Sequence, residues 1–176
     1  RMIVGTHGRI VELCRAHMSL IDLLAVASRM IGTGRIGGKS VGMLLARSML
    51  EHDNAHRFAG RLEPHDSFFV GADVFVSFLI ANGWWDLWTH HKRQGYFDAA
   101  SDLHTAIPTG RFPQRIREEF LQLMEYFGSS PIIVRSSSLL EDDYGNAFAG
   151  KYESVFLANQ GGPATRLEAF EDAIRT

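Results

Sequence analysis

The sequence has little cysteine, little excess charge and no long hydrophobic run. Cys14 is the single cysteine in 176 residues, so no disulfide can form within the chain; this is typical of a reducing compartment, and we expect a cytoplasmic protein. The 18 basic and 20 acidic side chains give a net charge of −2, which argues against a nucleic-acid or membrane-surface binder. The longest apolar region, residues 68–80, is interrupted by Gly71, Asp73 and Ser77 and is shorter than the ~20 residues that cross a bilayer.

What remains is the composition of an ordinary globular domain. Apolar residues make up 45% of the chain and charged residues 22%, which allows a sizeable core. No internal repeat or low-complexity segment is visible. The sequence starts with Arg1 and stops at Thr176 inside a helical pattern, so we expect a piece of a longer polypeptide. A homo-oligomer is one of the assembly states compatible with the sequence.

Hydrophobic periodicity predicts helices alternating with short strands. Helices are expected over residues 9–31, 39–50, 74–82 and 113–127, and after Pro163. Asp73 is expected to cap the helix at 74–82. Strands are expected over residues 67–70, 132–135 and 152–158, the middle one buried, while residues 51–66 and 84–111 are expected to be rich in loops. The pattern predicts an α+β fold with a mixed β-sheet flanked by helices.

Residues 34–40, GRIGGKS, are similar to a P-loop but fail its spacing. The pattern requires a glycine at the position of Thr33, and the helical pattern over residues 9–31 leaves no strand ahead of the loop. What remains is a glycine-rich turn with Lys39 at the start of a helix. Backbone N–H groups, the helix dipole and an ammonium group favour a phosphate there. The alternative is a flexible linker with an ordinary lysine.

The second candidate is RSSS, residues 135–138, directly after the strand IIVR. An arginine at a strand end has a fork of donors that suits phosphate oxygens, and the serines offer hydroxyl groups. The alternative for Arg135 is a salt bridge to Glu141, Asp142 or Asp143.

The third candidate is GNAFAGKYES, residues 145–154. Gly145 and Gly150 permit backbone conformations in which several N–H groups converge on an anion, and Lys151 and Ser154 add a charge and a hydroxyl. The alternative is a long hairpin turn.

Two other features favour ordinary roles. His52 and His56 have the spacing of two metal ligands on a helix, but no third ligand is evident, so no metal site is assigned within the chain. The cluster of Trp84, Trp85 and Trp88 is typical of core or interface packing.

Taken in order, GGKS and residues 131–158, PIIVRSSSLLEDDYGNAFAGKYESVFLA, resemble the N-terminal nucleotide-binding domain of the phosphoenolpyruvate synthase and pyruvate, phosphate dikinase family. The shared signatures are the GGK, the V-R-S-S strand and the F-A-G loop. The resemblance implies that residues 32–176 form the first lobe of an ATP-grasp-type domain, with residues 1–31 as an N-terminal helical extension. Residues 1–31 and 84–110 carry no resemblance.

The resemblance also implies which residues bind ATP. Lys39 in the GGK and Arg135 in the VRSS would contact nucleotide phosphates from opposite walls. A loop would fold over the β- and γ-phosphates, and its residues are Gly150, Lys151, Tyr152, Glu153 and Ser154. Glu141 and Asp142 match an acidic pair to which we assign a structural or indirect role.

The implied reaction is transfer of phosphate from ATP to a histidine and then to pyruvate. That histidine, the pyruvate-binding domain and the Mg²⁺ ligands are expected beyond Thr176, so the chain alone should lack turnover and no catalytic residue is assigned in it. FAGKYES departs from the usual F-A-G-Q-Q-[ED]-T, and GGKS from the usual GGKG. A related phosphotransferase with an antibiotic or glucan acceptor, and a non-catalytic regulatory or interaction module, remain alternatives.

Overall fold

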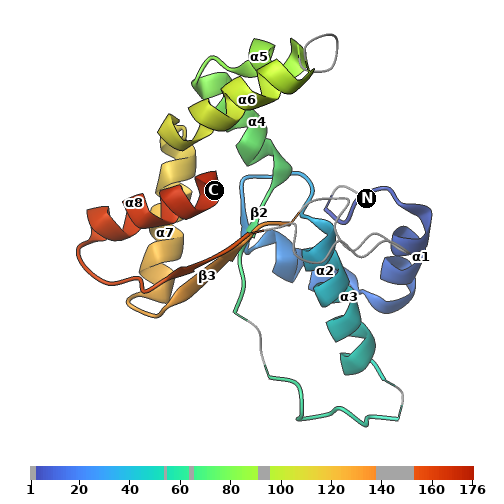
Figure 1. Cartoon of the computed structure of the whole chain (residues 1–176). Coiled ribbons are helices and arrows are strands. Elements are labelled where there is room, and N and C mark those ends of the chain that lie inside the picture. The colour runs from blue at the N-terminus through green and yellow to red at the C-terminus, as the bar shows by residue number, and fades with distance from the viewer. Residues whose placement is uncertain (1–2, 54, 64–65, 91–95, 138–152) are drawn as a thin grey trace. The chain divides into compact units, whose positions relative to one another are not determined.

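Figure 1 shows the computed structural model of the chain, which describes residues 3–53, 55–63, 66–90, 96–137 and 153–176, with the backbone alone for residues 90 and 96–99. The chain forms two compact units. Unit 1 comprises residues 1–72 and 137–152, and unit 2 comprises residues 73–136 and 153–176. The fold class is α+β, as the sequence predicts.

Unit 1 combines helices with one pair of short parallel strands. Its elements are α1 (Gly8–His17), α2 (Leu20–Ala27), β1 (Met30–Ile31), α3 (Gly38–Glu51) and β2 (Phe69–Val70). In the parallel pair, Met30 lies opposite Phe69 and Ile31 opposite Val70. The helix predicted at 39–50 and the strand predicted at 67–70 are therefore confirmed, the strand in shortened form.

The single helix predicted over residues 9–31 is wrong. Met18 and Ser19 have extended backbones, which end α1 and start α2. The Ser19 side chain accepts a hydrogen bond from the Asp22 N–H at 3.2 Å, and the Asp22 carboxylate accepts one from the Ser19 N–H at 2.7 Å. This reciprocal capping satisfies two donors at the start of α2 and fixes the break. The chain then enters β1, so a short strand does precede the glycine-rich turn, contrary to the prediction.

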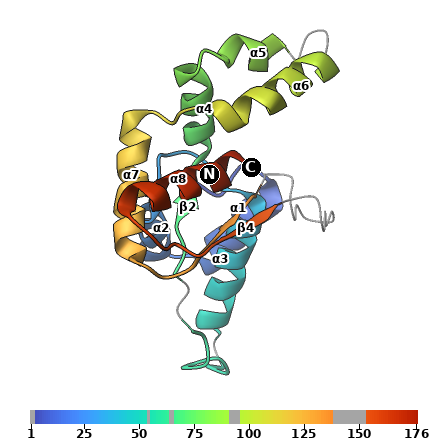
Figure 2. The same cartoon turned by 60° about the vertical axis from the view of Figure 1, so that its left-hand side comes forward.

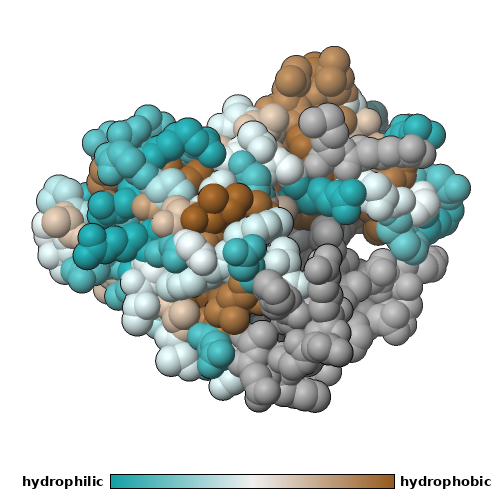
Figure 3. All heavy atoms as spheres, turned by 90° about the horizontal axis from the view of Figure 1, so that it is seen from above, coloured by the Kyte–Doolittle hydropathy of each residue, from teal (hydrophilic) through white to brown (hydrophobic). Residues whose placement is uncertain are grey.

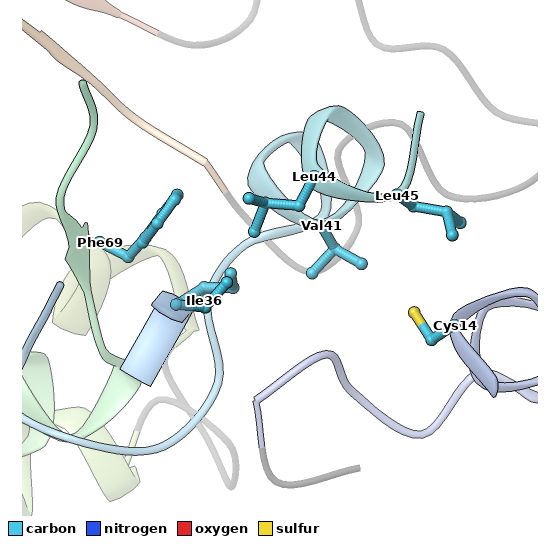
Figure 4. Packing of buried hydrophobic residues seen from close by; sticks show 7 residues of the cluster. Cys14, Ile36, Val41, Leu44, Leu45 and Phe69 are labelled. Atoms are coloured by element: carbon cyan, nitrogen blue, oxygen red, sulfur yellow. The ribbon is translucent and has the colours of Figure 1, made fainter. Parts of the chain in front are cut away.

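The core of unit 1 forms where α1, α3 and β2 meet (Figure 4). Helix α3 buries Val41, Leu44 and Leu45 on one face, and Cys14 of α1 and Phe69 of β2 belong to the same cluster. Burial raises the pKa of the Cys14 thiol above its usual value, because the thiolate would lose its hydration. Each large apolar side chain buried here contributes ~1.5–3 kcal/mol.

Residues from the N-terminal segment pack against this same cluster. They are Ile3, Val4, Ile10, Leu13, Met18 and Met30, all partly buried. Residues 1–31 are thus packed into the core that positions α3.

Unit 2 is mainly helical, with one antiparallel hairpin. Its elements are α4 (Ala72–Ala81, which starts on the last residue of unit 1), α5 (Trp85–His90), α6 (Tyr96–Ala106), the 3₁₀ turn η1 (Ile107–Thr109), α7 (Gln114–Phe127), β3 (Ile132–Arg135), β4 (Ser154–Leu157) and α8 (Pro163–Arg175). Figures 1 and 2 show α7 and α8 side by side, and α8 also contacts both strands.

The helix predicted after Pro113 and the strand IIVR are confirmed, but two other predictions for unit 2 are wrong. Residues 84–111 are not rich in loops, because α5 and α6 occupy most of them. Asp73 lies within the first turn of α4 instead of capping it, where its charge is still favourable to the helix dipole. On α7 the buried residues are Ile116, Phe120, Leu123 and Met124.

A row of aromatic rings forms the core of unit 2. Phe78 and Phe112 have ring centroids 4.7 Å apart, Phe112 and Phe120 5.1 Å, and Phe120 and Phe170 5.1 Å. Each such pair adds ~0.5–1.5 kcal/mol to the energy of burial. The row links α4, α7 and α8. Helix α8, which contacts both strands of the hairpin, is therefore packed into the aromatic core of unit 2.

Candidate phosphate-binding site

The glycine-rich turn between β1 and α3 is held in place by its backbone. Gly32 and Gly34 have φ angles of 67° and 89°, which side chains disfavour. The Ile36 N–H donates to the Ile3 carbonyl at 3.1 Å, and the Ala72 N–H donates to the Arg35 carbonyl at 3.0 Å. Ile36 itself is only 1% exposed. These anchors give the turn a fixed conformation, unlike that of a flexible linker.

Helix α3 begins directly after this turn, so the N–H groups of its first turn lie next to the glycine-rich segment. Gly37 is the N-cap, and no side chain among the described residues caps the first turn. The first main-chain bond runs from the Val41 N–H to the Gly37 carbonyl at 3.1 Å. Lys39, half-buried, lies in this first turn, where its positive charge adds to that of the helix dipole. A bound anion would offset both charges, which is the electrostatic basis of a phosphate site.

Ser137, in the serine-rich motif, packs against the N-cap of α3. A methyl group on Gly37 would lie 2.6 Å from the Cβ and carbonyl carbon of Ser137, and closer still to its Oγ. Gly37 has a φ of −71°, so this position favours glycine because of the close approach. The Ser137 Oγ is buried and has no hydrogen-bond partner among the described residues. Ser137 of the RSSS motif therefore contacts Gly37 of the GGK motif, and both residues belong to unit 1.

The hairpin β3–β4 presents Arg135 and Ser154 on one face. Arg135 lies opposite Ser154 in the antiparallel register, and both are exposed. One residue further on, the Ser136 N–H and hydroxyl each donate to the Glu153 carbonyl at 3.1 Å, which extends the pairing. The expectation that IIVR is buried is wrong. Its residues alternate between half-buried and exposed, because the strand belongs to a two-stranded hairpin that α8 covers on one side.

The remaining predicted site residues divide into two groups. Glu153 is described and exposed, at the entrance to β4. The others lie outside the described residues, and they are Gly150, Lys151, Tyr152, Glu141 and Asp142. Lys39 belongs to unit 1, whereas Arg135, Glu153 and Ser154 belong to unit 2.

Sequence reasoning missed the specific importance of Gly37 and Ser137. Both lie inside motifs that the sequence singles out, but nothing in the local pattern shows that they touch. It also missed a cavity of about 150 Å³ beside the start of α3. Its lining includes His7, Arg35 and Gly38, so the N-terminal segment reaches the neighbourhood of the glycine-rich turn.

Within the part of the chain that the structure describes, no three or more His, Cys, Asp or Glu side chains are grouped so as to hold a metal ion. Among the same residues, no helix has both the length and the apolar character of a membrane span.

A fixed glycine-rich turn leads into the start of α3, which carries Lys39, and Ser137 lies against its N-cap. This is the kind of helix start at which an anion is favoured. A family model described as pyruvate phosphate dikinase, AMP/ATP-binding domain, matches residues 33–175, and the chain belongs to this family. The ligand class of this domain is therefore an adenine nucleotide, AMP or ATP. No curated protein and no solved structure matches the chain. The matched residues include both GGK and RSSS, and the family seen in the motifs is confirmed.

Proposed function

We propose that residues 32–176 are the first ATP-grasp-type lobe of a cytoplasmic phosphoenolpyruvate synthase-like phosphotransferase, with residues 1–31 as a helical extension packed into its core. The residues that bind the ATP phosphates are Lys39, Arg135, Gly150, Lys151, Tyr152, Glu153 and Ser154. The observation that carries the proposal is the contact of Ser137 with Gly37, because it joins the two motifs that the family match covers.

The chemistry proposed for this chain is the grip on phosphate. The ammonium group of Lys39 and the N–H groups at the start of α3 offset negative charge on phosphate oxygens. The Arg135 guanidinium offers paired donors, and Ser154, opposite it in the hairpin, offers a hydroxyl. Such groups hold a phosphoryl donor in position and stabilise the charge of its transition state.

Other parts of the reaction are not assigned to residues of this chain. We propose that phosphate passes to pyruvate through a phosphohistidine outside residues 1–176. Mg²⁺ would neutralise charge on the phosphates, and its ligands are proposed to lie outside residues 1–176. The chain by itself should bind nucleotide without turnover.

The test is calorimetric titration of the 176-residue chain with ATP, AMP and inorganic tripolyphosphate. Lys39→Ala and Arg135→Ala are each expected to weaken ATP and tripolyphosphate binding about tenfold or more, because each removes a charge-assisted contact. Arg61→Ala in unit 1 and Arg111→Ala in unit 2 are matched controls, since both arginines are exposed and lie outside the proposed site. Unchanged binding in both site variants would refute the proposed site.

A further inference from the structure

A second cavity in unit 1 lies between α2 and the C-terminal half of α3. Its volume is about 240 Å³. Half of the residues that line it lie between positions 18 and 29, ahead of the family match at residues 33–175, and the others belong to α3 and β2. The part of the chain that the family model matches therefore supplies only one side of this cavity.

The floor of the cavity is apolar. Val26, Leu44 and Phe69 belong to the buried cluster of unit 1, and Met18 packs against that cluster. Leu44 and Phe69 are among the side chains drawn in Figure 4. Figure 3 shows that hydrophobic side chains reach the surface at several places, so an apolar floor alone does not assign a ligand. It does require that part of the ligand is apolar, because a polar group placed against it would lose its hydration.

Four charged side chains surround this floor, two of each sign. Arg29 and Arg47 are the cations, and Asp22 and Glu51 are the anions. A ligand with only a carboxylate would meet two carboxylates of the protein, and a ligand with only an amine would meet two guanidinium groups. A zwitterion offers an opposite charge to both pairs. The lining therefore matches a ligand that combines a carboxylate, an ammonium group and an apolar body.

The two arginines are held by residues that do not line the cavity. Arg29 Nη1 donates to the Asp66 carboxylate at 2.5 Å, and Arg47 Nη1 donates to the Glu63 carbonyl at 2.5 Å. Arg47 also pairs with Glu51 at 2.7 Å. Because a guanidinium group has five N–H donors, these contacts leave donors on Arg47 for a further carboxylate. Side chains that are already ordered lower the entropic cost of binding a ligand.

The acidic side of the cavity has an acceptor to offer as well. The Asp22 carboxylate accepts from the Ser19 N–H and from the Ser19 hydroxyl through the same oxygen, Oδ2. Its Oδ1 is therefore the atom that can accept from a ligand ammonium group. Asp22 and Ser19 are fixed by the capping of α2, so this acceptor has a defined position.

The volume of the cavity sets the size of the ligand. An apolar cavity of ~150 Å³ holds benzene, and water in the liquid occupies ~30 Å³ per molecule. The 240 Å³ here therefore equals about eight waters, which is room for one aliphatic amino acid. A nucleotide is too large for it, because pockets for ligands of that size have volumes of ~300–1,000 Å³.

We propose that this cavity binds a free α-amino acid with an aliphatic side chain. The ligand carboxylate pairs with Arg29 and Arg47. Its ammonium group donates to Asp22 and Glu51, and its side chain lies on the apolar floor. The inference goes beyond the proposed function and does not depend on it, because Glu51 is about 18 Å along α3 from Lys39. A bound amino acid would stabilise the packing of α2 against α3.

The experiment compares L-leucine with two probes that each lack one of its charges. Isocaproate keeps the branched chain and the carboxylate, and isoamylamine keeps the branched chain and the amine. In calorimetric titrations of the full chain, leucine is expected to bind about tenfold or more tightly than either probe, because each probe loses one charge-assisted contact. The urea midpoint should also rise with leucine concentration, since leucine binds the folded chain.

Two variants test the position of the ligand. Ala25→Leu places a larger side chain in the cavity from an exposed position on α2 and should weaken leucine binding about tenfold or more. Ala27→Leu is the matched control, because Ala27 is exposed on the same helix and does not line the cavity. Arg47→Met keeps an apolar stem without the charge, so it should weaken leucine and isocaproate binding and leave isoamylamine binding unchanged. Urea unfolding of each variant shows that the fold is retained.

Three results would overturn the amino-acid site. The first is that leucine binds no more tightly than isocaproate and isoamylamine, because the four charges would then recognise nothing. The second is that Ala25→Leu and Ala27→Leu bind leucine equally well, because the ligand would then lie elsewhere. The third is that the wild-type chain binds no leucine at millimolar concentration. The phosphate site is tested separately, by tripolyphosphate binding to Lys39→Ala, and none of these three results bears on it.

Discussion

Replacing Gly37 by alanine tests whether the contact between the GGK turn and Ser137 matters for the ligand. The added methyl carbon would lie 2.6 Å from the Cβ and from the carbonyl carbon of Ser137. Unstrained carbon atoms are ~3.5–4.0 Å apart, so one of the two segments must move by about 1 Å. Overpacking of this kind costs ~1–3 kcal/mol.

Two smaller terms modify that cost. Alanine is a poorer N-cap than glycine, which destabilises the start of α3 further. The φ of Gly37, −71°, is accessible to alanine. Because alanine lowers the conformational entropy of the unfolded chain, it offsets ~0.4–1 kcal/mol of the destabilisation. We expect Gly37→Ala to lower the free energy of unfolding by a net ~1–2 kcal/mol. We also expect it to weaken ATP binding about tenfold, because the helix start and the serine-rich segment are displaced from each other.

The assay is urea unfolding together with calorimetric titration of ATP. Gly42→Ala is the matched control, because Gly42 lies inside α3 and nothing lies within 4 Å of a Cβ built on it. This control should stabilise the helix by ~0.5–1 kcal/mol and leave ATP affinity unchanged. Gly37→Ala that binds ATP as tightly as wild type would refute the role of the contact. The double variant with Ser137→Gly should recover part of the lost stability, since the two residues are coupled.

Two further predictions concern ion pairs. Glu171 accepts from the Arg117 Nε at 2.6 Å and lies 3.7 Å from Arg175, whose side chain is 11% exposed, so Glu171→Ala removes a buried acceptor from two arginines, leaves the exposed Asp172 to pair with Arg175, and should cost ~1–3 kcal/mol in urea unfolding. Hydrogen bonds from Arg57 lower the pKa of Asp53 to about 2. The stabilisation from that pair is therefore full above the unfolded pKa of ~3.9 and is lost as pH falls toward 2, so the urea midpoints of wild type and Asp53→Asn should converge over that range.

Each ion-pair prediction has a control. Asp172→Ala removes a partner of Arg175 that is 65% exposed, and it should cost much less than Glu171→Ala. Equal costs would contradict the importance assigned to burial. For Asp53, a difference between wild type and variant that stays constant from about pH 5 to about pH 2 would show that the pair does not titrate as described.

The sequence predicted elements well where one periodic pattern is long and bounded by glycine or proline. Helix α7 after Pro113 is of this kind, and so is α3 after the glycine-rich turn. The break at Ser19 was missed because the apolar pattern continues through it, although the spacing of Ser19 and Asp22 is a recognisable helix start. Helices α5 and α6 were missed because tryptophans and polar residues obscure the helical period there.

The residues of the candidate site were likewise predicted only in part. Lys39 and Arg135 were found from motifs, since the chemistry of a phosphate requires cations beside backbone donors. The approach of Ser137 to Gly37 could not be predicted, because the two residues are far apart in the sequence and no local pattern encodes a contact between them.

The packing of the N-terminal segment has a consequence for any shortened form of this protein. The family match begins at residue 33, and a chain trimmed to that boundary would retain both phosphate motifs. It would also lose Cys14 and Val26 from the cluster that holds Val41, Leu44 and Leu45 of α3. Those side chains would then face water, and the helix whose start carries Lys39 would lose the support that orients it. For expression, the working boundary of the domain therefore lies upstream of α1.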